Sequence, residues 1–166
     1  MGITVDLLIF YGKIKDSKKE GGSTVISFVS DSTVKTEEFA EKIGKNLRGG
    51  MVIAFFGGLG AGKTSFTRGL ARGMGIKADV SSPTFAIVND YGGNPPLVHF
   101  DMYKVETWDD LYSSGFFDYL DMGAVLAVEW SENIENALPE DTVRVTIEKT
   151  ENENERIITV EGIDSI

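Results

Sequence analysis

The order of apolar and polar positions along the chain predicts several short strands joined by helices and turns. Five apolar runs have the length and composition of buried strands; they cover residues 25–29, 51–56, 86–91, 97–100 and 124–128. Residues 142–149 and 156–161 instead alternate in period two around the acidic segment ENENE, which predicts a solvated hairpin at the sheet edge. The composition GGNPP between the third and fourth runs predicts a second hairpin turn.

Helical periodicity occurs between these runs. Phe39, Ile43 and Leu47 recur at i, i+4 and i+8, so they form one apolar stripe. Thr36 precedes the stripe and is predicted as the helix N-cap, and the Gly-Gly pair at 49–50 is predicted to stop the helix. Three further segments have helical composition; they are residues 65–72, 107–113 and 115–120.

The chain divides in two at residue 24. Residues 1–24 are an appendage, in which an apolar piece over residues 3–11 is predicted as an extra edge strand. The polar piece KIKDSKKEGGS that follows is predicted as a flexible link. Residues 25–166 contain no repeat, low-complexity tract or interdomain linker, so they are predicted to form a single domain with its own core.

Charge and composition narrow the function classes. Sixteen Lys and Arg stand against 26 Asp and Glu, a formal net charge of −10. Because nucleic-acid binding depends on basic side chains, no contact with DNA is expected, and a role on RNA would need a basic partner. No cysteine is present to form a disulfide or a thiolate. The opening segment MGITVDLLIFYGK lacks a basic region and a membrane-spanning run, so a soluble cytoplasmic protein is expected, with no membrane partner.

The segment GGLGAGKT at residues 57–64 matches the phosphate-binding P-loop pattern G-x-x-x-x-G-K-[ST] at every position. A predicted strand precedes it and a helix-compatible stretch follows it, which is the setting that the motif requires. Lys63 is predicted to reach the β- and γ-phosphates, and the Thr64 hydroxyl to bind Mg²⁺. Backbone N–H groups and the helix N-terminus complete the predicted nucleotide site, which comprises Gly57, Gly58, Leu59, Gly60, Ala61, Gly62, Lys63, Thr64 and Ser65.

Phosphoryl transfer with Mg²⁺ also needs a carboxylate, commonly at the end of a buried strand beside the P-loop. Asp101 ends the fourth apolar run and Glu129 ends the fifth, so both are candidate metal ligands, although such carboxylates also serve as helix caps or ion-pair partners. His99 stands on the same strand face as Asp101; it is a candidate base, but a lone strand histidine is more often a hydrogen-bonded structural residue. Trp130 is suited either to packing near a base or partner, or to the core.

Arginine is scarce, and this bears on the rate of hydrolysis. The five arginines form no lid-like cluster that would clamp a transferring phosphoryl group; they are Arg48, Arg68, Arg72, Arg144 and Arg156. Where no such residue is supplied within the chain, NTP hydrolysis tends to be slow until a partner completes the site. The sequence therefore predicts a switch-like ATPase, weak alone and activated by a partner, unless Lys104 or a flexible loop supplies the charge.

Four segments follow one another along the chain: GGLGAGKTSFTRGLARGMG, SSPTFAIVNDY, VHFDMYKV and AVLAVEW. In this order and spacing they resemble the TsaE (YjeE) family, small bacterial P-loop ATPases of the tRNA threonylcarbamoyladenosine pathway. The resemblance covers residues 25–163. Many families share the P-loop alone, but its combination with S-P-T-[FY], H-F-D-x-Y and V-E-W is specific.

The resemblance implies an α/β fold of the P-loop NTPase type, with a mostly parallel central sheet, antiparallel additions and helices on both faces. It implies ATP and Mg²⁺ as cofactors, with Lys63 as the phosphate lysine and Thr64 as a metal ligand. Thr84 resembles the family's switch-like threonine beside the γ-phosphate, and Asp101 matches its Walker-B-like aspartate. Glu129 matches the family's V-E-W glutamate, which is implicated in Mg²⁺ binding and hydrolysis.

The same resemblance implies partners. TsaD-type and TsaB-type proteins carry threonylcarbamoyl transfer to the adenosine 3′ of the tRNA anticodon, at position 37, and ATP turnover supports or resets that complex. Contact with tRNA is then only indirect. The chain departs from the family in two ways: residues 1–24 precede the usual family start, and Lys104 stands where arginine is common, which keeps the charge but loses bidentate geometry.

Two other classes of P-loop protein compete with this interpretation. A small-molecule kinase is the main alternative for a compact P-loop domain, and it would carry an arginine-rich lid, which the sequence does not show. A GTPase switch would carry the guanine-reading motif N-K-x-D, which occurs nowhere in the chain.

Overall fold

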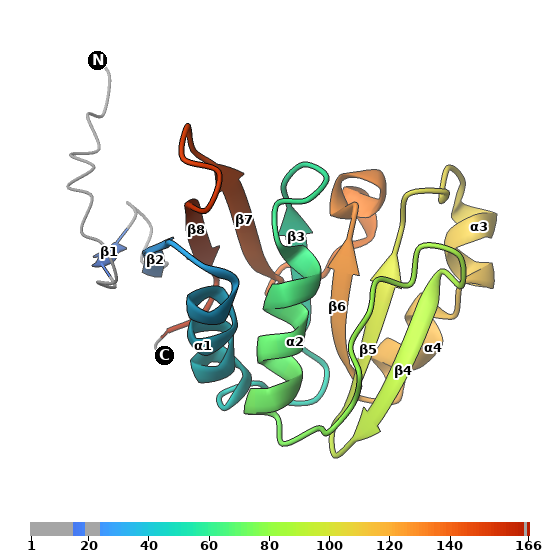
Figure 1. The fold of residues 1–166 in the computed structure, drawn as a ribbon. Helices are drawn as coiled ribbons and strands as arrows, with labels where there is room; N and C mark the ends of the chain where they lie inside the picture. Colours follow the sequence, from blue (N-terminus) through green and yellow to red (C-terminus); the bar gives the residue numbers. More distant parts are fainter. Residues whose placement is uncertain (1–14, 19–23, 165) are drawn as a thin grey trace.

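The computed structural model describes residues 15–18, 24–164 and 166. Within these ranges eight strands form one mixed sheet in the order β1-β2-β8-β7-β3-β6-β5-β4 (Figure 1). The strands are β1 (Lys15–Lys18), β2 (Thr24–Ser30), β3 (Val52–Phe56), β4 (Val88–Gly93), β5 (Pro96–Asp101), β6 (Val125–Glu129), β7 (Val143–Lys149) and β8 (Arg156–Glu161). The predicted edge strand over residues 3–11 lies outside the described ranges, and β1 falls within the segment predicted as a link.

The four central strands run parallel to one another. β3 pairs with β6 on one side and β7 on the other, and β6 pairs with β5. The remaining pairs are antiparallel: β8 joins β7 to β2, β1 pairs with β2, and β4 pairs with β5. The predicted α/β fold, with a parallel centre and antiparallel additions, is therefore confirmed, and the strand that precedes the P-loop lies near the middle of the sheet.

Helices cover both faces of this sheet. Helices α1 (Thr33–Gly44) and α2 (Lys63–Gly73) lie side by side over one face (Figure 1). Helices α3 (Trp108–Ser113) and α4 (Phe116–Asp121) and the 3₁₀ helix η1 (Ser131–Ala137) belong to the other face. No described helix is long and apolar enough to span a membrane.

Two hydrophobic clusters result, because successive side chains of a strand point to opposite faces. On β3, Ile53 and Phe55 pack in the cluster under α1 and α2, whereas Val52 packs in the cluster with α3 and α4. On β6, Ala127 joins the first cluster and Val128 the second. Because both faces of β3 and β6 are buried, these strands appear in the sequence as continuous apolar runs.

The first helix differs from its prediction at both ends. Ser32, not Thr36, is the N-cap, and its hydroxyl accepts a hydrogen bond from the Lys35 N–H at 3.3 Å. Thr36 lies inside the helix and is buried, with its hydroxyl 2.8 Å from that of Ser30. The helix ends at Gly44 rather than at the predicted Gly-Gly pair. Several Ser and Thr residues precede the apolar stripe, and only tertiary packing decides between them.

The hairpin of β7 and β8 was predicted at the sheet edge, and this was wrong. β7 pairs with β3 and β8 pairs with β2, so both strands are interior to the sheet. The apolar positions of the hairpin, among them Val145 and Val160, are buried in the cluster under α1 and α2. Period-two alternation indicates that one face of a strand is buried, but it does not indicate whether each strand of a hairpin pairs with another strand on its outer side.

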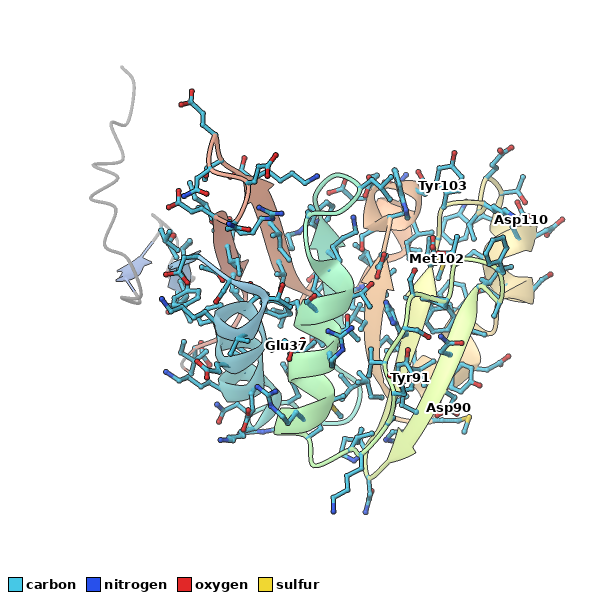
Figure 2. The ribbon with its side chains drawn as sticks, viewed as in Figure 1. Glu37, Asp90, Tyr91, Met102, Tyr103 and Asp110 are labelled. Atoms are coloured by element: carbon cyan, nitrogen blue, oxygen red, sulfur yellow. The ribbon has the colours of Figure 1, made fainter. Side chains whose placement is uncertain are left out.

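Helices α1 and α2 approach closely through glycines. A Cβ at Gly69 would lie 2.6 Å from the Ala40 Cβ and against the Glu37 carbonyl oxygen, and a Cβ at Gly73 would lie 2.8 Å from the Gly44 Cα. Beside this contact the Glu37 side chain, on α1 where it faces α2 (Figure 2), accepts a hydrogen bond from Arg68 Nη1 at 2.6 Å. The glycines, which have no side chain, therefore set the distance between the two helices. This contact helps to position α2, the helix that begins at the P-loop.

Gly69→Ala is expected to destabilise the protein. Alanine in place of a mid-helix glycine ordinarily gains about 1 kcal/mol from helix propensity. Here the added methyl group overpacks the helix contact, which typically costs about 1–3 kcal/mol, so the net free energy of unfolding should fall. Urea denaturation measures the change, with Gly58→Ala as the control because a Cβ there meets nothing within 4 Å. A more stable Gly69→Ala variant would contradict the close approach.

Candidate nucleotide-binding site

The P-loop connects β3 to α2 and curves because of its glycines. Gly60 and Gly62 have φ angles of 70° and 113°, which residues with a side chain adopt rarely. α2 begins at Lys63 directly after the loop, so its first N–H groups have no partner within the helix and lie at the loop. A Cβ at Gly58 or Gly62 would meet nothing within 4 Å, so no protein atom fills the space beside them. The predicted segment thus forms an open anion cradle at a helix N-terminus.

Lys63 is buried, and its ammonium group lies against the loop. Nζ donates to the carbonyl oxygen of Gly57 at 2.7 Å and to that of Gly58 at 3.0 Å. It also lies 5.7 Å from the centre of the Trp130 ring. A lysine is rarely buried without partners, and here the partners are backbone carbonyls and an aromatic face. One charge is thereby held within the loop.

A cavity of about 490 Å³ gathers the side chains predicted to act in catalysis. Its lining residues are Leu59, Gly60, Lys63, Thr64, Ser82, Thr84, Asp101, Tyr103, Glu129 and Trp130. Side chains from four separate segments therefore face one space; they are Lys63 and Thr64, Thr84, Asp101, and Glu129. The fold explains part of this convergence: β5 and β6 are parallel neighbours in which Asp101 is the register partner of Glu129, so both carboxylates stand at the same end of the sheet.

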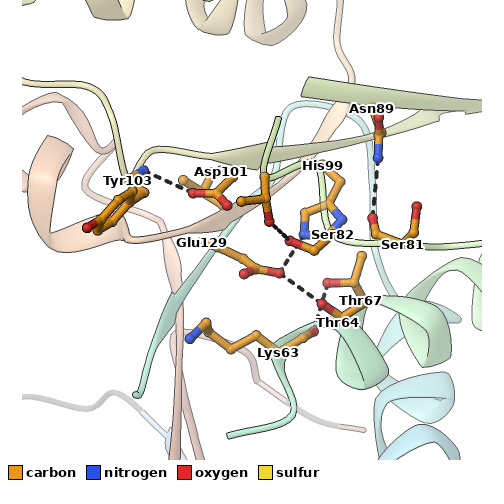
Figure 3. A network of polar contacts seen from close by, with 12 residues as sticks. Lys63, Thr64, Thr67, Ser81, Ser82, Asn89, His99, Asp101, Tyr103 and Glu129 are labelled. Carbon is orange, nitrogen blue, oxygen red and sulfur yellow. Dashed lines mark hydrogen bonds and ion pairs between the residues drawn. The ribbon is translucent and has the colours of Figure 1, made fainter. Parts of the chain in front are cut away.

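Glu129 is the centre of the polar contacts in this cavity (Figure 3). Its Oε1 accepts a hydrogen bond from Thr64 Oγ1 at 3.3 Å and lies 2.9 Å from His99 Nε2. Glu129 is 6% exposed and His99 is fully buried. Asp101, also 6% exposed, accepts a hydrogen bond from the Tyr103 N–H at 3.0 Å through Oδ1. The lone histidine is therefore a buried, hydrogen-bonded strand residue, and its partner is a predicted metal ligand.

A second cavity of about 350 Å³ shares Gly60 and Thr64 with the first. Its lining residues are Ser32, Thr33, Thr36, Gly60, Ala61, Gly62, Thr64, Ser65, Glu153, Asn154 and Arg156. The β7–β8 hairpin reaches the P-loop beside it, since Arg156 Nε donates to the Ala61 carbonyl at 3.1 Å and Lys149 Nζ to that of Leu59 at 2.8 Å. Sequence reasoning missed both contacts, because they join positions about 90 residues apart and no motif marks them.

The arginines have their contacts outside the first cavity. None of its described lining residues is an arginine. Arg68 and Arg72 pair with glutamates of α1, Arg144 pairs with Glu135, and Arg156 donates to backbone carbonyls. Lys104 lines a neighbouring cavity that shares Tyr103 and Trp130 with the first. The described lining residues of the first cavity thus include no arginine, whereas Arg156 lines the second cavity beside the P-loop.

The donor set of the first cavity fits a nucleotide with Mg²⁺. The ammonium of Lys63 and the open loop suit phosphate oxygens, and the hydroxyl of Thr64 with the carboxylates of Glu129 and Asp101 are the hard oxygen donors that Mg²⁺ prefers. In the described ranges no three His, Cys, Asp or Glu side chains converge as a complete metal cage. Mg²⁺ is usually bound through one or two carboxylates together with substrate phosphates, rather than by such a cage.

The chain is similar to known proteins both in sequence and in structure. The sequence profile of the family described as threonylcarbamoyl adenosine biosynthesis protein TsaE matches residues 30–158. The tRNA threonylcarbamoyladenosine biosynthesis protein TsaE of Treponema pallidum is 35% identical over 119 residues, which cover 72% of this chain and 88% of that protein. The protein of the same name from Bacillus subtilis is 37% identical over 130 residues, or 78% and 80% of the two chains. The crystal structure of Bacillus subtilis YdiB matches with a TM-score of 0.71 at 31% identity, covering 84% of this chain and 86% of that one.

Proposed function

The chain belongs to the TsaE family and acts in tRNA threonylcarbamoyladenosine biosynthesis; from this membership we propose that it is a Mg²⁺-dependent ATPase that supports or resets a TsaD–TsaB complex. The observation that carries the proposal is the convergence of Lys63, Thr64 and Glu129 on one cavity beside an open P-loop. Each residue supplies one element that phosphoryl transfer needs: a fixed positive charge, a metal-binding hydroxyl and a carboxylate.

The loop and Lys63 bind the phosphates in this proposal. Backbone N–H groups at the start of α2 and around Gly60 and Gly62 point at the anion, and the helix dipole favours negative charge there. Lys63 turns its ammonium from the Gly57 and Gly58 carbonyls toward the β- and γ-phosphates. It needs little rearrangement to do so, because it is already held inside the loop.

Thr64, Glu129 and Asp101 are the residues that would hold Mg²⁺, which would neutralise charge on the phosphate oxygens. Glu129 accepts hydrogen bonds from Thr64 and His99 through Oε1, which restricts the directions of its carboxylate before a ligand arrives. In this proposal the same carboxylate orients an attacking water. Thr84, which lies on the loop after α2 and lines the same cavity, contacts the γ-phosphate.

A partner is proposed to complete the site. The described lining of the cavity contains no arginine to stabilise the transferring group, so the isolated chain should bind ATP but hydrolyse it slowly. TsaD-type and TsaB-type proteins are the proposed partners. The net charge of −10 fits docking on a more basic protein surface, and it makes direct contact with tRNA unfavourable.

The proposal is tested by measuring ATP hydrolysis with the TsaD–TsaB pair absent and present. We expect the isolated chain to bind ATP, measured by calorimetry, and its turnover to rise at least about tenfold with the pair, because residues supplied by a partner commonly limit such sites. Failure to bind ATP would remove the P-loop assignment. A high rate in the isolated chain that ignores the pair would favour an independent ATPase or a kinase.

A further inference from the structure

A chain of hydrogen bonds leads from Glu129 to the loop that follows α2. His99 Nε2 lies 2.9 Å from Glu129 Oε1, and His99 Nδ1 lies 3.4 Å from the Tyr91 hydroxyl. That hydroxyl donates to the Ser81 carbonyl at 2.8 Å and accepts from the Ser81 N–H at 3.3 Å. Ser82, next in the chain, lines the same cavity as Glu129. The carboxylate and the loop are therefore joined through two side chains that no motif assigns to the reaction.

Within this series of hydrogen bonds, the hydroxyl proton of Tyr91 is the one that two acceptors can share. An ionised carboxylate only accepts, so His99 Nε2 carries the proton that faces Glu129, and in the neutral ring Nδ1 is then an acceptor. The Tyr91 hydroxyl has a single proton and two acceptors within reach, the Ser81 oxygen at 2.8 Å and His99 Nδ1 at 3.4 Å. In this structure the proton points to the loop, because the shorter distance favours Ser81.

The segment 81–87, defined here as the SPT loop, has the features of an element with more than one position. It contains no strand or helix, and Phe85 within it is 96% exposed. At its end Ile87 has a φ of 71°, an outlier for a β-branched residue. Two hydrogen bonds hold the backbone of Ile87: its N–H donates to the Pro83 carbonyl at 2.8 Å, and its carbonyl accepts from the Asp101 N–H at 2.9 Å. Strained backbone of this kind is frequent in switch regions.

We propose that Tyr91 and His99 are positioning residues that couple the SPT loop to Glu129 by exchange of one hydrogen bond. When Ser82 and Thr84 move toward a γ-phosphate, the Ser81 carbonyl leaves Tyr91, and the hydroxyl proton turns to His99 Nδ1. The ring is then fixed from both nitrogens and holds Glu129 in one orientation. The functional role of this coupling rests on the proposed ATPase activity, but the hydrogen bonds of Tyr91 are present in the nucleotide-free protein and can be tested there.

Two substitutions test the contributions of the two acceptors, the Ser81 carbonyl and His99 Nδ1. Amide hydrogen exchange of the nucleotide-free protein measures their effects. Tyr91→Phe keeps the ring and removes the hydroxyl, which makes two hydrogen bonds with Ser81. Amide exchange of Ser81 and Ser82 should therefore speed up by at least about two- to tenfold, the value of one hydrogen bond. His99→Gln keeps an N–H donor for Glu129 and removes the Nδ1 acceptor. Ser81 is then the single acceptor, and exchange at the same amides should slow. Tyr112→Phe, on an exposed ring of α3, is the control and should change neither.

Opposite changes in exchange support the proposal, and any other pattern overturns it, since a packing role would loosen the loop in both variants. Thermal melting of each variant shows that it is folded. In ATPase assays with the partner pair, both variants should lower kcat with KM for ATP unchanged, because positioning and not binding is lost. If wild-type protein hydrolysed no ATP, the proposed function would fail, while the exchange measurements would still decide whether Tyr91 shares its proton.

Discussion

Lys63→Ala is expected to remove measurable ATP binding. The cationic side chain of Lys63 lines the same cavity as Thr64 and Glu129. Its ammonium group is held inside the loop by hydrogen bonds to two backbone carbonyl groups. Truncating one member of a buried, hydrogen-bonded charge pair costs about 2–5 kcal/mol, so Kd should rise from about 30-fold to several thousand-fold. Titration calorimetry with ATP measures the loss.

The matched control for this variant is Lys149→Ala. Lys149 also donates to a P-loop carbonyl, that of Leu59, but it is exposed and is not among the residues that line the cavity. Its removal should weaken ATP binding by less than about tenfold, the value of one ordinary hydrogen bond. Both variants should keep their free energy of unfolding within about 1 kcal/mol, because water can replace the lost donor at an open loop. Unchanged ATP affinity in Lys63→Ala would contradict the P-loop assignment.

The P-loop could be located from the sequence because its requirements are local. Eight consecutive positions, a preceding apolar run and a following helix define it, and the structure contains the loop between β3 and α2 as expected. The same holds for Asp101 and Glu129. Each ends a buried run, and parallel strands bring their ends to one edge of the sheet, so their proximity follows from the topology.

Interactions that depend on packing between distant segments could not be predicted. The contacts of Arg156 and Lys149 with the P-loop require β7 to lie beside β3, a pairing that the alternation of the hairpin does not encode. The N-cap at Ser32 is similar, because Thr36 has equal capping chemistry but is buried against Ser30. Tyr91 ends the segment SSPTFAIVNDY, but nothing in the sequence assigns it a role, since its contacts arise only where β4 pairs with β5 and places its hydroxyl near His99.

Glu129→Gln is expected to stop hydrolysis while leaving nucleotide binding nearly intact. Glutamine has almost the same volume, and its amide oxygen can still accept from Thr64 and from His99, so the hydrogen bonds at 3.3 Å and 2.9 Å are retained. The negative charge is removed, and the second carboxylate oxygen becomes an NH₂ group that cannot bind Mg²⁺. Loss of a catalytic carboxylate costs about 10²- to 10⁴-fold in rate, so kcat with the partner pair should fall by that factor. Single-turnover hydrolysis measures it, and Kd for ADP without Mg²⁺ should stay within about threefold.

Two further measurements assign the loss to the charge of Glu129. The Mg²⁺ concentration that supports half-maximal ATP binding should rise in Glu129→Gln, because a neutral oxygen is a weaker ligand for a hard cation. Glu132→Gln is the control: the same chemical change on η1, at an exposed residue outside the nucleotide cavity, should alter neither quantity. Normal hydrolysis by Glu129→Gln would make Glu129 a structural acceptor for His99 and Thr64. Asp101 would then be the one carboxylate, among the described residues that line the cavity, left to hold the metal.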